Sequence, residues 1–188
     1  MRYLVARGFT LAETVVVIAV VSILSLLLAA LVFAFDGAYR FQQASVDTTS
    51  SASLLMRRSA EVILPAINVL PSRSFGGTLH ISGATAVVLK LPSIDVNGVA
   101  LTGVYDYAVV YLSGGSVYRI VEADPTSARL PQTHLLSEVV DSLSITYDTA
   151  DITEARLITI DLTTSVTVRD SVASAHVTQS LPLRNYQP

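Results

Sequence analysis

The uncharged segment from Thr14 to Phe35 limits what this chain can fold into more than any other feature. Its 22 residues include no charged residue, no Pro and no Gly. As an α-helix it would be about 33 Å long, enough to cross the hydrocarbon core of a bilayer. A secretory signal peptide has a shorter apolar region, about 7–15 residues, followed by a small-residue cleavage site. The sequence therefore predicts one membrane-spanning helix near the N-terminus.

Basic residues before this segment predict its orientation. Arg2 and Arg7 precede the apolar run. Because positively charged flanks stay in the cytoplasm, we expect the N-terminus inside the cell and the C-terminal domain on the other side of the membrane.

Composition excludes several classes of function. The 188 residues include 12 Lys+Arg and 15 Asp+Glu, a formal charge of −3. This balance offers no basic stripe for a phosphate backbone, so no direct nucleic-acid binding is predicted. Cysteine is absent, which excludes disulfides, thiolate metal sites and a Cys nucleophile.

Two residues near the start of the apolar run do not fit a simple anchor. Glu13 places a carboxylate within the apolar segment, and such residues usually mark a function. Gly8 has no side chain, which leaves its backbone open to a protease. Cleavage after Gly8 would create an ammonium on Phe9, with which Glu13 of a neighbouring subunit could pair. Low dielectric strengthens that pairing, although desolvation offsets much of the gain.

The run Arg7-Gly8-Phe9-Thr10-Leu11-Ala12-Glu13, followed by an uncharged helix, resembles the class III signal of type IV prepilins and type II secretion pseudopilins. The resemblance implies that a membrane prepilin peptidase cuts after Gly8 and methylates Phe9. It also implies that Glu13 guides assembly with other pilin or pseudopilin subunits on an inner-membrane assembly platform. Ala12 departs from the usual Ile or Val. Ala30 stands near the place where many pilins carry a helix-bending Pro.

The resemblance also implies a location and a division of the chain. Residues 1–8 would be the prepilin leader, 9–35 the transmembrane and assembly helix, 36–70 its amphipathic continuation and 71–188 a β-rich globular domain. The chain would cross the inner membrane once, in contact with lipid, with its C-terminal domain in the periplasm. It would then enter a pseudopilus or pilus.

Apolar residues at intervals of three, four or seven predict that the helix continues beyond the membrane, from Phe9 to about Leu64. Low-bulk residues weaken this stripe through Asp47–Ser53, and Leu54, Leu55, Met56 and Leu64 strengthen it later. Pro65 lacks a backbone donor and predicts the end of the helix. The stripe consists of Phe41, Ala44, Thr48, Ala52, Leu55, Val62 and Ile63.

From Thr78 onward the apolar period changes to two, which is typical of β-strands. Asp95–Gly98 and Ser113–Gly115 supply the Gly residues that tight hairpin turns require. The expected fold class is therefore α+β, with a long N-terminal helix packed on a mainly antiparallel, pilin-like sheet. Candidate strands are Thr78–Ser82, Ala86–Leu91, Val104–Leu112, Ser116–Val121, Val139–Tyr147, Arg156–Leu162 and Ala173–Leu181.

The second half of the chain resembles a subgroup of the same family. Leu91–Gly98, Tyr105–Tyr107, Ser116–Arg119 and Leu183–Asn185 are similar to the globular region of J-type minor pseudopilins and W-type minor pilins. The resemblance implies a minor subunit. The missing Cys pair separates the chain from major pilins of the disulfide-looped kind.

The sequence offers little for catalysis, so we predict no enzyme activity and no cofactor. His80, His134 and His176 stand far apart, outside the spacings of metal or catalytic motifs. Asp95-Val-Asn97-Gly98 resembles the start of a calcium loop, and Asp106 occupies its twelfth position. A hairpin turn is the preferred interpretation, and no metal site is predicted.

Two hypotheses from different classes follow. The first is a structural filament subunit, processed after Gly8 and assembled through its N-terminal helix. The second is a membrane-tethered module that does not polymerise and whose β-domain binds a ligand. Only the first requires cleavage at Gly8.

Overall fold

The computed structural model describes residues 10–169 and 171–186 and has an α+β fold, as the sequence predicts. The chain divides into two compact units, with the boundary between Gln43 and Ala44. One helix and ten strands are described: α1 (Leu11–Ile63), β1 (Asn68–Leu70), β2 (Ser72–Phe75), β3 (Thr78–Ile81), β4 (Ala86–Ile94), β5 (Ala100–Ser113), β6 (Ser116–Glu122), β7 (Gln132–Ser137), β8 (Val140–Tyr147), β9 (Leu157–Val168) and β10 (Ser171–Pro182). A short 3₁₀ helix, η1, covers Ile152–Glu154.

Helix α1 runs without interruption from Leu11 to Ile63. Its last backbone bond joins the N–H of Leu64 to the Ala60 carbonyl, at 3.0 Å. Pro65 follows and cannot donate the next bond, so the predicted C-terminal end is correct to within one residue. The predicted start at Phe9 lies outside the described residues.

The predicted apolar stripe is largely confirmed in the second unit. Ala44, Thr48, Ala52, Leu55, Val62 and Ile63 are buried, and Met56 and Ser59 join them. Two predictions were wrong: Phe41 is 42% exposed and Leu54 is 48% exposed. Leu54 precedes the fully buried Leu55 by one residue, which rotates its side chain about 100° away from the buried face. Phe41 lies before the unit that contains the sheets.

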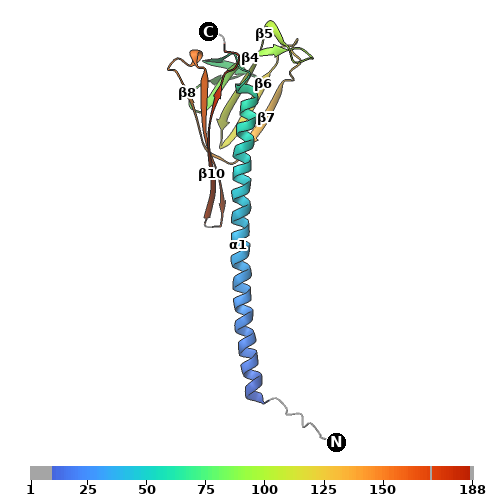
Figure 1. Cartoon of the computed structure of the whole chain (residues 1–188), viewed down its shortest axis with the longest axis vertical. Coiled ribbons are helices and arrows are strands. Elements are labelled where there is room, and N and C mark those ends of the chain that lie inside the picture. The colour runs from blue at the N-terminus through green and yellow to red at the C-terminus, as the bar shows by residue number, and fades with distance from the viewer. Residues whose placement is uncertain (1–9, 170, 187–188) are drawn as a thin grey trace. The chain divides into compact units, whose positions relative to one another are not determined.

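The strands form three antiparallel sheets (Figure 1). The five-stranded sheet has the order β1-β4-β5-β6-β7, the three-stranded sheet has the order β10-β9-β8, and β2 pairs with β3 alone. Two backbone bonds join β8 to the turn before β4 and to the β5–β6 turn. The Ile145 N–H donates to the Ala84 carbonyl at 2.7 Å, and the Val140 N–H donates to the Gly115 carbonyl at 3.1 Å.

Alternation along the strands of the larger sheet creates two apolar layers. On β4, Val87, Leu89 and Leu91 belong to the main core with Leu55 and Ile63 of α1. Val88, between them, faces the other way and packs with Phe75 and Val109 in a second cluster that includes a residue of β2. Period-two patterning therefore separates the face that packs with the helix from the face that packs with β2.

Both predicted hairpin turns are confirmed. Ser113 pairs with Ser116 across a two-residue turn of Gly114 and Gly115, whose φ angles are 59° and 77°. Positive φ at both positions matches the twist of antiparallel strands and costs Gly little. At the β4–β5 turn, Gly98 also has positive φ.

Three described strands were missed by sequence reasoning: β1, β2 and β7. β1 and β2 have three and four residues and flank Pro71, so neither is long enough to show a period of two. β7 has a weak pattern and is held by pairing with β6, Ile120 with Thr133 for example. The β9–β10 hairpin is longer than predicted because both strands continue to Val168 and Ser171.

Low-bulk residues on α1 let the sheet approach the helix backbone. The hydroxyl of Thr164 on β9 donates to the backbone carbonyl of Thr48 at 3.1 Å, and both residues are fully buried. Ala52, one turn later, is also fully buried. The small residues that weakened the predicted stripe are therefore the ones that the close contact requires.

We expect Ala52→Leu to destabilise the domain by about 1–3 kcal/mol, because the added atoms overpack a face that already contacts β9. Denaturant unfolding of the full chain in detergent would measure the change. Ser50→Leu, at an exposed position of the same helix, is the matched control and should leave the free energy of unfolding almost unchanged. Equal stability of the two variants would contradict the close-packing account.

Candidate functional site

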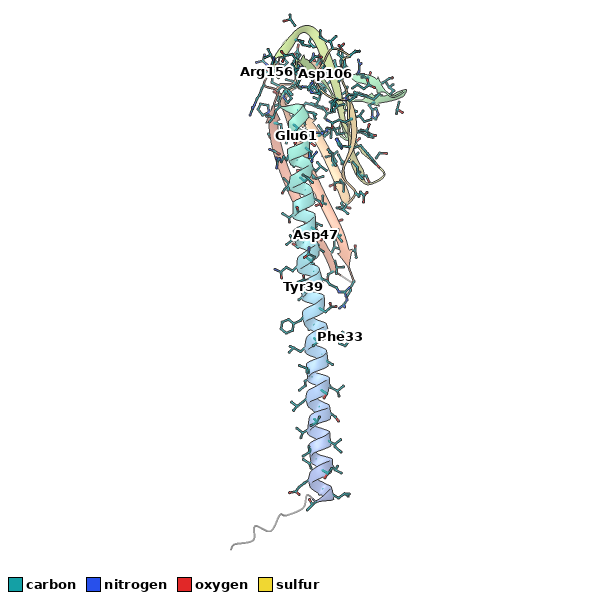
Figure 2. The ribbon with its side chains drawn as sticks, turned by 90° about the vertical axis from the view of Figure 1, so that its right-hand side faces the viewer. Phe33, Tyr39, Asp47, Glu61, Asp106 and Arg156 are labelled. Atoms are coloured by element: carbon teal, nitrogen blue, oxygen red, sulfur yellow. The ribbon has the colours of Figure 1, made fainter. Side chains whose placement is uncertain are left out.

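The Leu11–Phe35 part of α1 exposes apolar side chains around its whole circumference. Sixteen large apolar side chains in this range are each at least 49% exposed. Figure 2 shows side chains pointing outward on all sides of the helix below Phe33. A helix that is apolar all round needs lipid or other protein around it. α1 is long and apolar enough to span a membrane.

The free energy of burying apolar side chains indicates which environment the Leu11–Phe35 segment needs. Complete burial of one Val, Leu, Ile or Phe side chain contributes about 1.5–3 kcal/mol. Sixteen such side chains in water would forgo on the order of tens of kcal/mol, more than the typical stability of a whole domain. An apolar environment is therefore the main requirement of this part of the chain.

The hydroxyl groups inside the apolar segment are satisfied locally. Ser22 donates to the Ile18 carbonyl and Ser25 to the Val21 carbonyl, each at 2.8 Å. A hydroxyl without a partner is costly in hydrocarbon, and bonding to the preceding turn removes that cost. These serines are therefore compatible with lipid contact.

Glu13 forms a reciprocal cap at the start of α1. Its Oε2 accepts from the backbone N–H of Thr10 at 2.8 Å and from the Thr10 hydroxyl at 2.9 Å. In return, the Glu13 N–H donates to the Thr10 hydroxyl at 3.3 Å. This is a capping box, which satisfies two of the N–H groups that a helix start leaves unpaired.

Sequence reasoning missed this cap, although Thr10-x-x-Glu13 is its signature. Within the described residues, both hydrogen bonds to the Glu13 carboxylate use Oε2, and none of these residues donates to Oε1. Oε2 therefore closes the helix start. Gly8 and Phe9, the predicted cleavage and methylation sites, lie outside the described residues.

Asp95 was considered as a calcium ligand, but its carboxylate accepts hydrogen bonds from the backbone of its own turn. Its Oδ1 accepts from the N–H groups of Asn97 and Val99, each at 2.8 Å. The Val99 N–H is the main group that lowers the pKa of the Asp95 carboxyl below its usual range. Across residues 10–169 and 171–186, no group of three or more His, Asp or Glu side chains could hold a metal ion. The geometry is that of a hairpin turn.

The three histidines lie in separate surroundings. His80 packs between the rings of Phe75 and Tyr111. His176 bonds to the Asp161 carboxylate at 2.9 Å, and His134 bonds to a neighbouring glutamine on β7. No triad or metal spacing links them, which agrees with their separation in the sequence.

Asp106 on β5 is a buried carboxylate. Nothing in the sequence indicated that it organises the residues around it. It is fully buried and accepts from the Ser93 hydroxyl at 2.7 Å, the Ser127 hydroxyl at 2.8 Å and the Asp124 N–H at 2.8 Å. The Arg129 guanidinium completes its shell. With both oxygens filled by donors, Asp106 ties the 123–131 loop to β4 and β5 and has no lone pair directed at a substrate.

Comparison with known proteins adds no family assignment. No protein-family model matches the chain, and no curated protein matches it.

We expect Glu13→Ala to loosen the first turn of α1 because it removes the cap, at a cost of about 1 kcal/mol. Glu13→Gln should keep the cap, because a Gln at this position can also accept from the N-cap residue. Amide exchange at residues 10–14 of the full chain in micelles would measure the difference. Exchange that is equally fast in both variants would show that the carboxylate charge, and not the cap, orders the helix start.

Proposed function

We propose that this chain is a structural subunit, most similar to a minor subunit, of a type II secretion pseudopilus or a type IV pilus. In this proposal the chain is held in the inner membrane by α1 with its N-terminus in the cytoplasm. A prepilin peptidase cuts after Gly8 and methylates Phe9. The processed chain then joins other pilin subunits on an assembly platform through its N-terminal helix.

The observation that carries the proposal is one carboxylate at the start of an all-apolar, exposed helix. Glu13 follows Gly8 and Phe9 by a few residues, and the large side chains after it are apolar and exposed. Such a surface suits lipid before assembly and neighbouring helices afterwards. A membrane tether alone would need the apolar surface but not Gly8 or Glu13 at these positions.

The capping box gives Glu13 two compatible roles. Through Oε2 it caps its own helix, which offsets part of the cost of placing a carboxylate near membrane depth. Through Oε1 it can meet the ammonium of a processed Phe9 from another subunit. In low dielectric a charge pair of this kind is worth more than in water, provided that hydrogen bonds also satisfy the carboxylate.

Leader removal also changes the charge that sets orientation. The first eight residues contain Arg2 and Arg7 and no acidic residue, so cleavage changes the formal side-chain charge from −3 to −5. The charges that retain the N-terminus in the cytoplasm are thus lost when the subunit becomes competent to assemble. The new ammonium on Phe9 is the only positive charge left at that end.

Processing is the direct test. We expect mass spectrometry of the protein from its native host to find an N-terminal methyl-Phe9, and Gly8→Val to leave the leader attached because a side chain blocks access to the scissile bond. Ala6→Val is a matched control inside the leader and should still be cut. A native protein that keeps Met1 would instead favour the membrane-tethered binding module.

Assembly can be separated from capping with the same pair of Glu13 variants. We expect Glu13→Gln to be cleaved and capped normally but to enter filaments at least about tenfold less often, because it lacks the charge that pairs with the Phe9 ammonium. Immunoblots of sheared filaments against membrane fractions would measure incorporation. Normal incorporation of Glu13→Gln would refute the charge-pairing role.

A further inference from the structure

Strand β10 presents a long free edge. It pairs with β9 over all 12 of its residues and ends the three-stranded sheet. Among the described residues, no backbone bond joins β10 to any other element. In an antiparallel pair, alternate residues point their N–H and C=O groups away from the partner strand. These groups on β10 therefore face outward and can pair with one more extended segment.

The edge also lacks the features that usually prevent such pairing. Ser171–Pro182 contains no Lys, Arg, Asp or Glu, and its pairing with β9 has no bulge. Natural edge strands are commonly protected by Lys residues, Pro residues, bulges or a covering element. On β10 the only Pro is at the last position, so the rest of the edge is open to another strand.

A groove lies beside the same strand. It measures about 550 Å³ and runs between β10 and α1, with Met56, Ala60, Leu64 and Val177 as its apolar lining. Val177 points from β10 toward α1, on the face that carries the main core. An added strand next to β10 would direct alternate side chains into this groove. Figure 1 shows β10 running beside α1 in this region.

Charge at the groove restricts the occupant further. Glu61, labelled in Figure 2, is already paired with Arg119 of β6 at 2.9 Å. Arg57 also lines the groove, is exposed, and has no carboxylate partner among the described residues. Ser53 and Gln179 are the uncharged polar residues of the lining, and Arg57 is its one cation without a carboxylate partner among the described residues, which suits a single carboxylate on the occupant.

A second copy of this chain can pair with the edge in antiparallel fashion only with its Ala44–Ile63 helix segment reversed. β10 runs in the same direction as the Ala44–Ile63 part of α1: Thr164, opposite Ala175, bonds to Thr48, and the Arg184 N–H bonds to the Leu64 carbonyl. Antiparallel β10 strands from two copies would place these helices in opposite directions. Two copies whose Ala44–Ile63 helix segments run in the same direction therefore cannot pair through β10 in antiparallel fashion.

We propose that the outer edge of β10 and the adjoining groove bind an extended segment of a partner protein, which joins the three-stranded sheet as a fourth strand. The segment carries apolar side chains at alternate positions, which enter the groove, and one carboxylate that meets Arg57. Main-chain bonds supply affinity and the groove supplies specificity, as in other cases of strand addition. The site lies in the β-rich unit and goes beyond the proposed assembly through α1.

The chain itself supplies a probe. A synthetic 12-residue peptide with the sequence of β9, Leu157–Val168, has the alternation that pairs with β10 and so tests strand addition; its one carboxylate, Asp161, lies on the face opposite its buried apolar side chains. Fluorescence anisotropy of the labelled peptide, titrated with the full chain in micelles, would measure binding. The control peptide carries Pro in place of Ile160 and Leu162, because Pro cannot donate to a ladder and is excluded from central strands.

We expect Val177→Lys to weaken peptide binding at least about tenfold, because it places a charge in the groove. Ser174→Lys is the matched control on the opposite, exposed face of β10 and should bind like the unmodified chain. Bound peptide should also slow amide exchange along β10. Should Val177→Lys fail to fold, Gln179→Lys, at an exposed position that lines the groove, takes its place.

Equal binding by the Val177 and Ser174 variants, or equal binding of the Pro-containing peptide, would overturn the proposal. So would self-association of the full chain that Val177→Lys abolishes, because the occupant would then be a second copy. Peptide binding to β10 does not depend on cleavage of the leader. A chain that keeps its leader in the native host would remove the proposed filament function and leave this binding result unchanged.

Discussion

The burial of apolar surface on α1 is the interaction on which the rest of the structure depends. From Ala44 to Ile63 the helix has one apolar face, and the sheets cover it. From Leu11 to Phe35 it is apolar all round, and its side chains stay exposed. One continuous helix thus meets two different requirements, a folded β-domain on one part and an apolar environment on the other. The change from an apolar circumference to an apolar stripe determines where each begins.

Polar contacts then fix how the helix and the sheets meet. Arg119 on β6 is almost fully buried and donates to the Arg58 carbonyl at 3.0 Å and to Glu61 at 2.9 Å. Thr164 bonds to the helix backbone from β9. Hydrophobic burial is non-directional, whereas these bonds have defined donors and acceptors, so they specify the register of α1 against the strands. At the other end of the helix, Glu13 has a comparable local role as the capping partner of Thr10.

Much of the fold could be predicted because it depends on local periodicity. The helix, its end near Pro65, seven strands and the two Gly-containing turns each have a pattern that a short window contains. β1, β2 and β7 do not, because their pairing partners lie far away in the chain and their own residues show no clear alternation. Glu13 could be recognised as a functional candidate because it is charged and lies in an apolar run. Its capping role could be recognised only together with Thr10, three residues earlier. Asp106 seemed relevant only to a metal loop, and its donors come from β4 and the 123–131 loop.

The sequence by itself determined the apolar segment long enough to span a membrane, the order of helix and strands, and the position of a lone carboxylate in an apolar run. These properties depend on residue type and spacing, which folding does not change. Only the tertiary structure decided that β10 ends its sheet with an open edge, that a groove separates it from α1, and that Asp106 is filled by four donors. Strand order and the hydrogen bonds around Asp106 depend on contacts between residues that are distant in the sequence. No local pattern indicates which strand lies at the edge of a sheet.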